Sequence, residues 1–315
     1  MVSRIVPGFV VVFACVTVFA AVPDAQRRGG APPGGPGGPG RGGRGAAAPG
    51  TIERITIRGK ALEGNRQGDS ADREVVVYLP PDYAGDQARR FPVVYLLHGS
   101  GERENAFVEV LARLQESADR LAGAQGFSEF IVVTPNASTA QKASLYAASP
   151  DAGDWERFVA DDLVAAIDSR YRTLTNRMSR AIAGHAEGGL AAVRIGMKRP
   201  EVFANLYAMS ACCLAPAEQV AATVEKYAAN LKAYYAIAID VGSADPAVEL
   251  NRQFHAALTR LRVAHAYEEY DGDRSNRLRE RMDRNVLTFF ARNLASPANL
   301  TSPSAAADQL ANQSR

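Results

Sequence analysis

Residues that bind metals or form disulfides are scarce in this sequence. It has three cysteines and four histidines among 315 residues. No Cys-x-x-Cys pair occurs, and no cysteine stands close to a histidine. The sequence therefore excludes a four-ligand structural zinc site and a disulfide framework.

An excess of charge of one sign is also missing. The chain has 36 basic and 34 acidic residues, a net charge of +2, which excludes a protein that binds nucleic acid through its overall field. The apolar run near the N-terminus is interrupted by Pro7 and Gly8. It keeps about 14 uninterrupted residues, fewer than the roughly 20 that a membrane-spanning helix needs.

The two ends of the chain differ in composition from the part between them. One cation, Arg4, precedes the apolar run, and small residues follow it, so residues 1–25 are predicted to be a secretory signal peptide. An uncleaved membrane anchor and lipidation at Cys15 are the alternatives. Residues 26–50 hold 11 of the 27 glycines and no large apolar residue, which predicts a disordered linker. A folded domain is expected over residues 51–295 and a flexible tail over residues 296–315.

Short β-rich runs alternate with helical stretches inside the expected domain. The candidate strands are residues 54–57, 74–78, 92–97, 130–133, 181–183, 206–209, 236–239 and 265–267. The candidate helices are residues 155–171, 188–198, 246–262 and 276–295. This alternation predicts an α/β fold with one doubly wound, mostly parallel sheet covered by helices on both faces. The first two strands follow one another without a helix and are expected to form an antiparallel edge.

Two segments that follow candidate strands carry small residues in a recognisable spacing. One is His98-Gly99-Ser100-Gly101, and the other is Gly184-His185-Ala186-Glu187-Gly188. The second has the spacing of a nucleophile elbow, Gly-x-Ser-x-Gly, in which a strained strand-to-helix turn lifts the central side chain into a pocket. The central residue here is alanine, not serine. In a parallel sheet both segments should lie at the same edge, beyond the carboxyl ends of the strands.

Longer segments carry a resemblance to a known family. They are YLPPDY at 78–83, FPVVYLLHGSG at 91–101, DWERFVADDLVAAIDSRYRT at 154–173, SRAIAGHAEGGLAAVRIGMKRPEVFANLYAMS at 179–210 and EYDGDRSNR at 269–277. Together they resemble the putative esterase family, the branch of α/β hydrolases with esterase D (S-formylglutathione hydrolase), feruloyl esterases and mycolyltransferases. The resemblance covers residues 51–295. It implies an eight-stranded α/β-hydrolase fold, no metal or other cofactor, and ester or thioester cleavage by a Ser, Asp, His triad.

The resemblance places the three triad members on residues of this chain. The nucleophile falls on Ala186, the acid on Asp245 and the base on Arg274. Alanine has no oxygen that could attack a carbonyl carbon, and a protonated arginine cannot accept a proton as a general base. The family's oxyanion hole uses backbone N–H groups, which here belong to Ser100 and Glu187 and survive any change of side chain.

None of the four histidines stands where the resemblance requires a base. His98 and His185 are expected to pack beneath their turns, while His255 lies within a helix and His265 opens a strand. All four are predicted to be structural.

The adjacent cysteines 212 and 213 lack an evident base that would lower the pKa of a thiol. Adjacent cysteines rarely form a disulfide, because the eight-membered ring strains the peptide. They are therefore predicted to be small buried residues.

The charges at the degenerate triad suggest two hypotheses. Arg274 should lie within reach of Asp245 and could pair with it, and Glu187, at a position where the family usually carries methionine, could approach the same space. The first hypothesis is an anion or carboxylate site built from Arg274 and the oxyanion N–H groups. The second is that these charges merely face an abandoned cleft.

Three classes of function are compatible with these residues. The first is a secreted or periplasmic homologue with impaired catalysis that binds a small ester, glycosidic or carboxylate ligand, or a protein partner. The second is a carboxylic-ester hydrolase of low or unconventional activity. The third is a structural envelope protein held by its glycine-rich linker. A nucleic-acid partner is not expected for any of them.

Overall fold

The computed structural model describes residues 49–111, 113–122, 128–140, 144–211 and 219–295. The predicted signal peptide, nearly all of the predicted linker, the predicted tail and both adjacent cysteines lie outside these residues.

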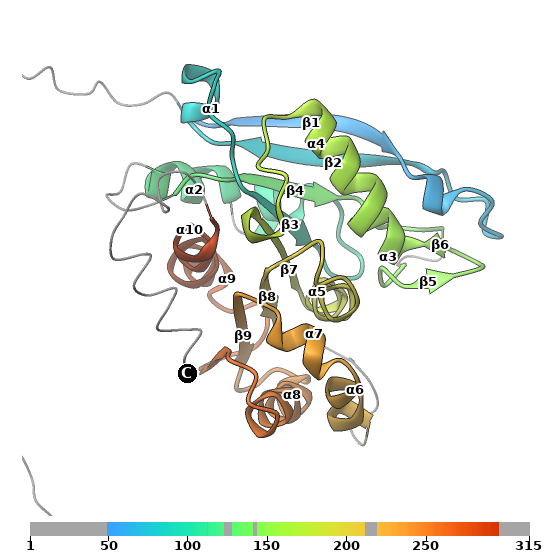
Figure 1. Cartoon of the computed structure of the whole chain (residues 1–315), viewed down its shortest axis with the longest axis vertical. Helices are drawn as coiled ribbons and strands as arrows, with labels where there is room; N and C mark the ends of the chain where they lie inside the picture. The colour runs from blue at the N-terminus through green and yellow to red at the C-terminus, as the bar shows by residue number, and fades with distance from the viewer. Residues whose placement is uncertain (1–48, 112, 123–127, 141–143, 212–218, 296–315) are drawn as a thin grey trace, which may run out of the picture. The chain divides into compact units, whose positions relative to one another are not determined.

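Strands and helices alternate along the described chain (Figure 1). The strands are β1 (Thr51–Arg58), β2 (Asp72–Leu79), β3 (Val93–Leu97), β4 (Ile131–Pro135), β5 (Ala148–Ser149), β6 (Gly153–Asp154), β7 (Arg180–His185), β8 (Asn205–Met209), β9 (Ala236–Gly242) and β10 (Ala266–Tyr270). The α-helices are α1 (Asp82–Gly85), α2 (Leu114–Ala122), α3 (Trp155–Arg157), α4 (Val164–Arg170), α5 (Glu187–Lys198), α6 (Val220–Lys226), α7 (Ala228–Lys232), α8 (Val248–Arg260), α9 (Leu278–Arg281) and α10 (Thr288–Asn293). Short 3-10 segments are η1 (Lys60–Leu62) and η4 (Arg177–Ser179), and π-helical segments are η2 (Ala106–Leu111), η3 (Phe158–Leu163) and η6 (Met282–Leu287).

Eight of these strands form one sheet. Their order is β1-β2-β4-β3-β7-β8-β9-β10. The pairs from β4 to β10 are parallel, whereas β1 pairs antiparallel with β2 and β2 antiparallel with β4. The eight predicted strands and the antiparallel edge are therefore confirmed.

Helices cover both faces of the sheet. Successive strand residues point to opposite faces, and both sets of side chains are apolar and buried here. In β3, Val93, Tyr95 and Leu97 belong to one buried cluster and Val94 and Leu96 to another. The first cluster includes residues of α5, α6 and α8, and the second includes residues of α2 and α10. Figure 1 shows α2 and α10 on one side of the sheet and α4 and α5 on the other. This is the doubly wound arrangement predicted from the apolar strands.

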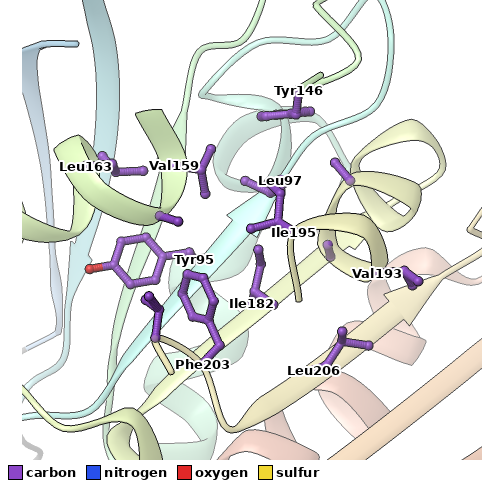
Figure 2. Close-up of a cluster of buried hydrophobic side chains, with 14 of the residues drawn as sticks. Tyr95, Leu97, Tyr146, Val159, Leu163, Ile182, Val193, Ile195, Phe203 and Leu206 are labelled. Carbon is purple, nitrogen blue, oxygen red and sulfur yellow. The ribbon is translucent and has the colours of Figure 1, made fainter. Parts of the chain in front are cut away.

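The first cluster is packed with large side chains from strands and helices (Figure 2). The rings of Tyr95 and Phe203 meet edge to face, with their centroids 5.8 Å apart. The predicted helical stripe joins the same cluster, and all of its members are buried: Trp155, Val159, Leu163, Ile167 and Tyr171. Its strict four-residue spacing passes through a π-helical turn, η3, between α3 and α4.

Some elements were not predicted from the sequence. The strands β5 and β6 have two residues each and pair only with each other, so they are too short for an alternating pattern. The helices α2, α6 and α7 were also missed. Within the described ranges, no helix combines the length and the apolar character that crossing a membrane requires.

Candidate active site

Three predicted site segments lie beyond the carboxyl ends of β3, β7 and β9. Strands β3 and β7 are neighbours, and only β8 separates β7 from β9. Because these strands are parallel, the segments that follow them reach the same edge of the sheet. The topology therefore brings Ser100, Ala186 and Asp245 to one region.

The turn between β7 and α5 has the backbone geometry of a nucleophile elbow. Ala186 has φ 52° and ψ −117°, a conformation that side-chain-bearing residues rarely adopt, and it is 3% exposed. A Cβ atom on Gly184 would lie 2.1 Å from the carbonyl oxygen of Gly188. A Cβ atom on Gly188 would lie 2.1 Å from the carbonyl oxygen of Leu97. The two glycines are therefore required for the close approach of α5 to β7 and β3.

The loop after β3 faces this elbow directly. A Cβ atom on Gly99 would lie 3.5 Å from the Cβ of Ala186. His98 is 3% exposed and anchors the loop, with its Nδ1 2.8 Å from the carbonyl oxygen of Gly99 and its Nε2 3.0 Å from the amide nitrogen of Ala137. Because the Ala137 amide can only donate, Nε2 accepts and the ring proton is on Nδ1. His98 therefore packs beneath its turn, as predicted.

The backbone N–H of Ser100, predicted as an oxyanion donor, already has an acceptor within the chain. It donates to Oε2 of Glu187 at 3.1 Å. The carboxylate lies over the loop, since a Cβ atom on Gly99 would be 3.3 Å from the same oxygen. The predicted carboxylate site would need this N–H group, and a carboxylate of the chain itself occupies it.

Glu102 holds the other side of this loop and was not singled out from the sequence. Its Oε2 accepts the backbone N–H of Gly99 at 2.9 Å. Burial raises the pKa of the Glu102 carboxyl, the hydrogen bond from Gly99 opposes this rise, and the nearby charge of Glu187 adds to it. The sequence spacing could have indicated this contact, because a glutamate three residues after Gly99 can reach back to the Gly99 amide within one turn.

Asp245 and Arg274 form the ion pair that the sequence suggested. Nη2 of Arg274 lies 3.0 Å from Oδ1 of Asp245, and the side chains are 29% and 0% exposed. The same Oδ1 accepts the backbone N–H of Ala247 at 2.8 Å. The backbone segments that carry Asp245 and Arg274 approach each other closely. A Cβ atom added to Gly242 would lie only 2.2 Å from the carbonyl oxygen of Gly272. Arg274 therefore stands beside Asp245, where the family resemblance places the base.

His185 connects the elbow to the Arg274 loop. Its Nε2 lies 3.0 Å from the carbonyl oxygen of Arg274, and the residue is 5% exposed. Burial lowers the pKa of His185 to about 4, so the ring is neutral at pH 7. It packs beneath the elbow, as predicted.

The other two histidines contact each other. Nδ1 of His255, in α8, is 2.7 Å from Nε2 of His265, just before β10. His255 also stacks on Tyr267, with ring centroids 4.3 Å apart. These contacts give both rings a structural role, as predicted. Within the ranges described above, His, Cys, Asp and Glu side chains form no group of three or more that could hold a metal ion.

A pocket opens beside the elbow. Its lining residues are His98, Gly99, Ser100, Ala137, Ser144, Leu145, Tyr146 and Glu187, and its space is about 200 Å³ including the opening to solvent. Leu145 is 44% exposed, and the buried Tyr146 accepts the backbone N–H of His98 through its hydroxyl at 3.1 Å. Both have positive φ, 50° and 52°. No sequence pattern indicated a role for these two residues.

Comparisons with known proteins agree with this architecture. A family model described as "Putative esterase" matches residues 70–294. An endo-1,4-beta-xylanase/feruloyl esterase from Xylanibacter ruminicola is 33% identical over 131 residues, which are 40% of this chain but only 18% of that protein. A solved ferulic acid esterase is 25% identical with a TM-score of 0.69, over 78% of this chain and 99% of the other. An S-formylglutathione hydrolase from Agrobacterium tumefaciens is 20% identical with a TM-score of 0.61, over 80% and 98%, and so shares the fold.

Proposed function

Because the chain belongs to the putative esterase family and has its α/β-hydrolase fold, we propose that it is a member without efficient ester hydrolysis, which binds a ligand beside the elbow. One observation carries the proposal: the residue at the elbow has no nucleophilic atom, and a guanidinium is paired with Asp245 where a base is needed.

The loss of hydrolysis follows from the chemistry of the two residues. The methyl group of Ala186 cannot form an acyl intermediate, and an arginine, which is not deprotonated in proteins, cannot act as a general base at position 274. Removing nucleophile and base from a serine hydrolase lowers kcat by about a millionfold. Asp245 is paired with Arg274 and therefore does not orient a histidine, which is the role of the acid in a triad.

The histidines near the elbow offer no replacement. Both ring nitrogens of His98 are engaged with backbone groups. The pKa of about 4 makes His185 a weak base at neutral pH, and its Nε2 is held by the carbonyl of Arg274. Neither ring is a candidate for activating a water molecule efficiently.

The pocket beside the elbow supports ligand binding. It combines an exposed apolar side chain, Leu145, with polar groups of Ser144 and Glu187. Its space of about 200 Å³, which includes the opening to solvent, is smaller than the roughly 300–1,000 Å³ of typical ligand pockets, so it suits one small group of a ligand, such as a hydroxyl or a methyl group. We therefore favour a small ester-like or glycosidic ligand. The apolar N-terminal run supports export of the protein through a signal peptide.

The absence of hydrolysis is tested with p-nitrophenyl acetate and methyl ferulate. We expect the purified protein to release product no faster than its Asp245→Asn variant, because no triad depends on that carboxylate. An active feruloyl esterase is the positive control for the assay. Turnover above the blank that falls in the Asp245→Asn variant would refute the proposal and favour the low-activity esterase.

Ligand binding is tested by thermal unfolding of the same protein. The probes are a neutral ester, methyl ferulate, and a neutral sugar, xylobiose. We expect at least one of them to raise the melting temperature, because a ligand that binds only the folded state stabilises it. Leu145→Glu should abolish the rise, whereas Lys232→Glu, which changes an exposed residue outside the pocket lining, should keep it. No rise with either probe would favour the structural class instead.

A further inference from the structure

We propose that Glu187 is a specificity-determining residue: its carboxylate fills the oxyanion position of the elbow, so the site rejects carboxylates and, among neutral ester-like and glycosidic ligands, selects those that donate hydrogen bonds. This inference rests on the proposed function and names the ligand class of the same pocket. The hydrogen bond from the Ser100 amide to Oε2 of Glu187, 3.1 Å long, carries it.

The position of the carboxylate leaves no free donor for an incoming oxyanion at Ser100. In an acyl-transferring site, backbone N–H groups bind the oxygen on which negative charge develops. Here the oxygen at that amide belongs to the residue directly after the elbow residue, at the start of α5. A ligand oxygen could bind the same N–H group only by displacing a charged acceptor, which is stronger than a neutral carbonyl.

Two acidic side chains bind this loop, and one of them lines the pocket. Glu102 accepts the neighbouring amide of Gly99 at 2.9 Å, so two acidic side chains hold two consecutive N–H groups of one loop. The guanidinium of Arg274 is paired with Asp245 at 3.0 Å. Glu187 lines the pocket and Glu102 does not, so Glu187 is the acceptor that a ligand meets there. A hydroxyl group of a sugar can donate to the Glu187 carboxylate, whereas an anion is repelled by it.

This arrangement makes a prediction for reversion of the triad. Restoring serine and histidine alone should leave a poor enzyme, because Glu187 would still occupy the oxyanion position. Loss of one oxyanion donor costs about 100- to 1,000-fold in kcat. The triple variant Ala186→Ser, Glu187→Met, Arg274→His should therefore hydrolyse p-nitrophenyl acetate at least about 100-fold faster than the double variant Ala186→Ser, Arg274→His.

Glu102 provides a matched control. Glu102→Gln removes a neighbouring negative charge but keeps an acceptor for the Gly99 amide, and it leaves the contact of Glu187 with Ser100 in place. Adding it to the double variant should not raise the rate toward that of the triple variant. A double variant as fast as the triple variant, or an equal gain from Glu102→Gln, would overturn the inference.

A binding measurement tests the same point without any catalysis. In the natural protein, the amide resonance of Ser100 should stay in place when sodium acetate is added to 100 mM at constant ionic strength. In the Glu187→Met variant, the same titration should shift this resonance saturably, because the N–H group is then free for the acetate oxygen. An acetate-dependent shift in the natural protein, or none in the variant, would overturn the inference even if neither revertant is active.

The outcomes separate this inference from the proposed function. Ester turnover by the natural protein that depends on Asp245 would refute the proposed function whatever the role of Glu187. Equal rates of the double and triple variants, with an inactive natural protein, would refute only the role of Glu187.

Discussion

At the residue scale, the elbow keeps a strained backbone although no serine needs it. Ala186 has φ 52° and ψ −117°, and such a conformation costs a side-chain-bearing residue of the order of 1–3 kcal/mol. The Cβ of Ala186 still faces the loop of Gly99. The strain is explained by the close packing of Gly184 and Gly188, which fixes the turn between β7 and α5.

His98 gives a prediction about the pH dependence of stability. Burial lowers its pKa from 6.5 to about 4, so between these values the unfolded chain binds more protons than the folded one. The contribution of neutral His98 to the free energy of unfolding is complete above pH 6.5 and is lost as the pH falls toward 4. A shift of this size amounts to up to about 3 kcal/mol of unfolding free energy.

Urea unfolding at pH 7.5 and at pH 5 measures this effect. The free energy of unfolding should be lower at pH 5, and His98→Asn should reduce the difference between the two pH values. The difference should not vanish, because burial also lowers the pKa of His185 to about 4. An unchanged pH dependence in His98→Asn would contradict the assignment of a neutral, buried His98.

At the element scale, the position of α5 depends on the lack of side chains at its first turn. A Cβ atom on Gly188 would lie 2.1 Å from the carbonyl oxygen and 2.5 Å from the carbonyl carbon of Leu97. These are backbone atoms in the centre of the sheet and cannot move aside. Gly188→Ala should therefore lower the free energy of unfolding by at least about 3 kcal/mol, the upper range for overpacking.

Gly85→Ala is the matched control for this change. Gly85 ends the exposed helix α1, and a Cβ atom there would meet nothing within 4 Å. Its stability should change by less than about 1 kcal/mol, in the stabilising direction, because alanine favours helix. Chemical denaturation of both variants is the measurement. Similar losses in the two variants would show that the close approach of α5 is not the cause.

Helices and strands could be predicted from the sequence where the apolar residues repeat several times at a regular spacing. The stripe from Trp155 to Tyr171 has five members, and all are buried in one cluster. Two-residue strands such as β5 and β6 give no period, and the short helices α6 and α7 turn only part of their surface to the core.

At the scale of the whole molecule, a buried charge network joins the last strands to the C-terminal helices. Arg281, in α9, pairs with Asp240 in β9 and donates to the hydroxyl of Tyr270. Tyr207, in β8, donates to Oδ2 of Asp240 at 2.9 Å. Burial raises the pKa of Asp240, and the charge of Arg281 opposes this rise. Nη1 of Arg281 is also 3.4 Å from the carbonyl oxygen of Arg274, which links the network to the site.

Removing the cation should be costly. Arg281→Met should lower the free energy of unfolding by about 3–5 kcal/mol, because it leaves Asp240 buried and unpaired. Adding Asp240→Asn should recover part of this loss, since the amide oxygen still accepts the hydroxyl of Tyr207 while the buried charge is gone. Urea unfolding of the two variants measures both effects. A double variant no more stable than the single one would contradict the charge explanation.

The sequence by itself predicted the fold class and the eight strands of the sheet, because strand and helix periods are local properties of the chain. The triad positions Ala186, Asp245 and Arg274 were implied by the resemblance of the sequence to a known family. The tertiary structure alone decided what these residues touch. The pairing of Arg274 with Asp245 was suggested by the sequence but needed the approach of Gly242 to Gly272. The contact of Glu187 with Ser100 joins residues 87 positions apart, and it arises because parallel strands bring their carboxyl ends together.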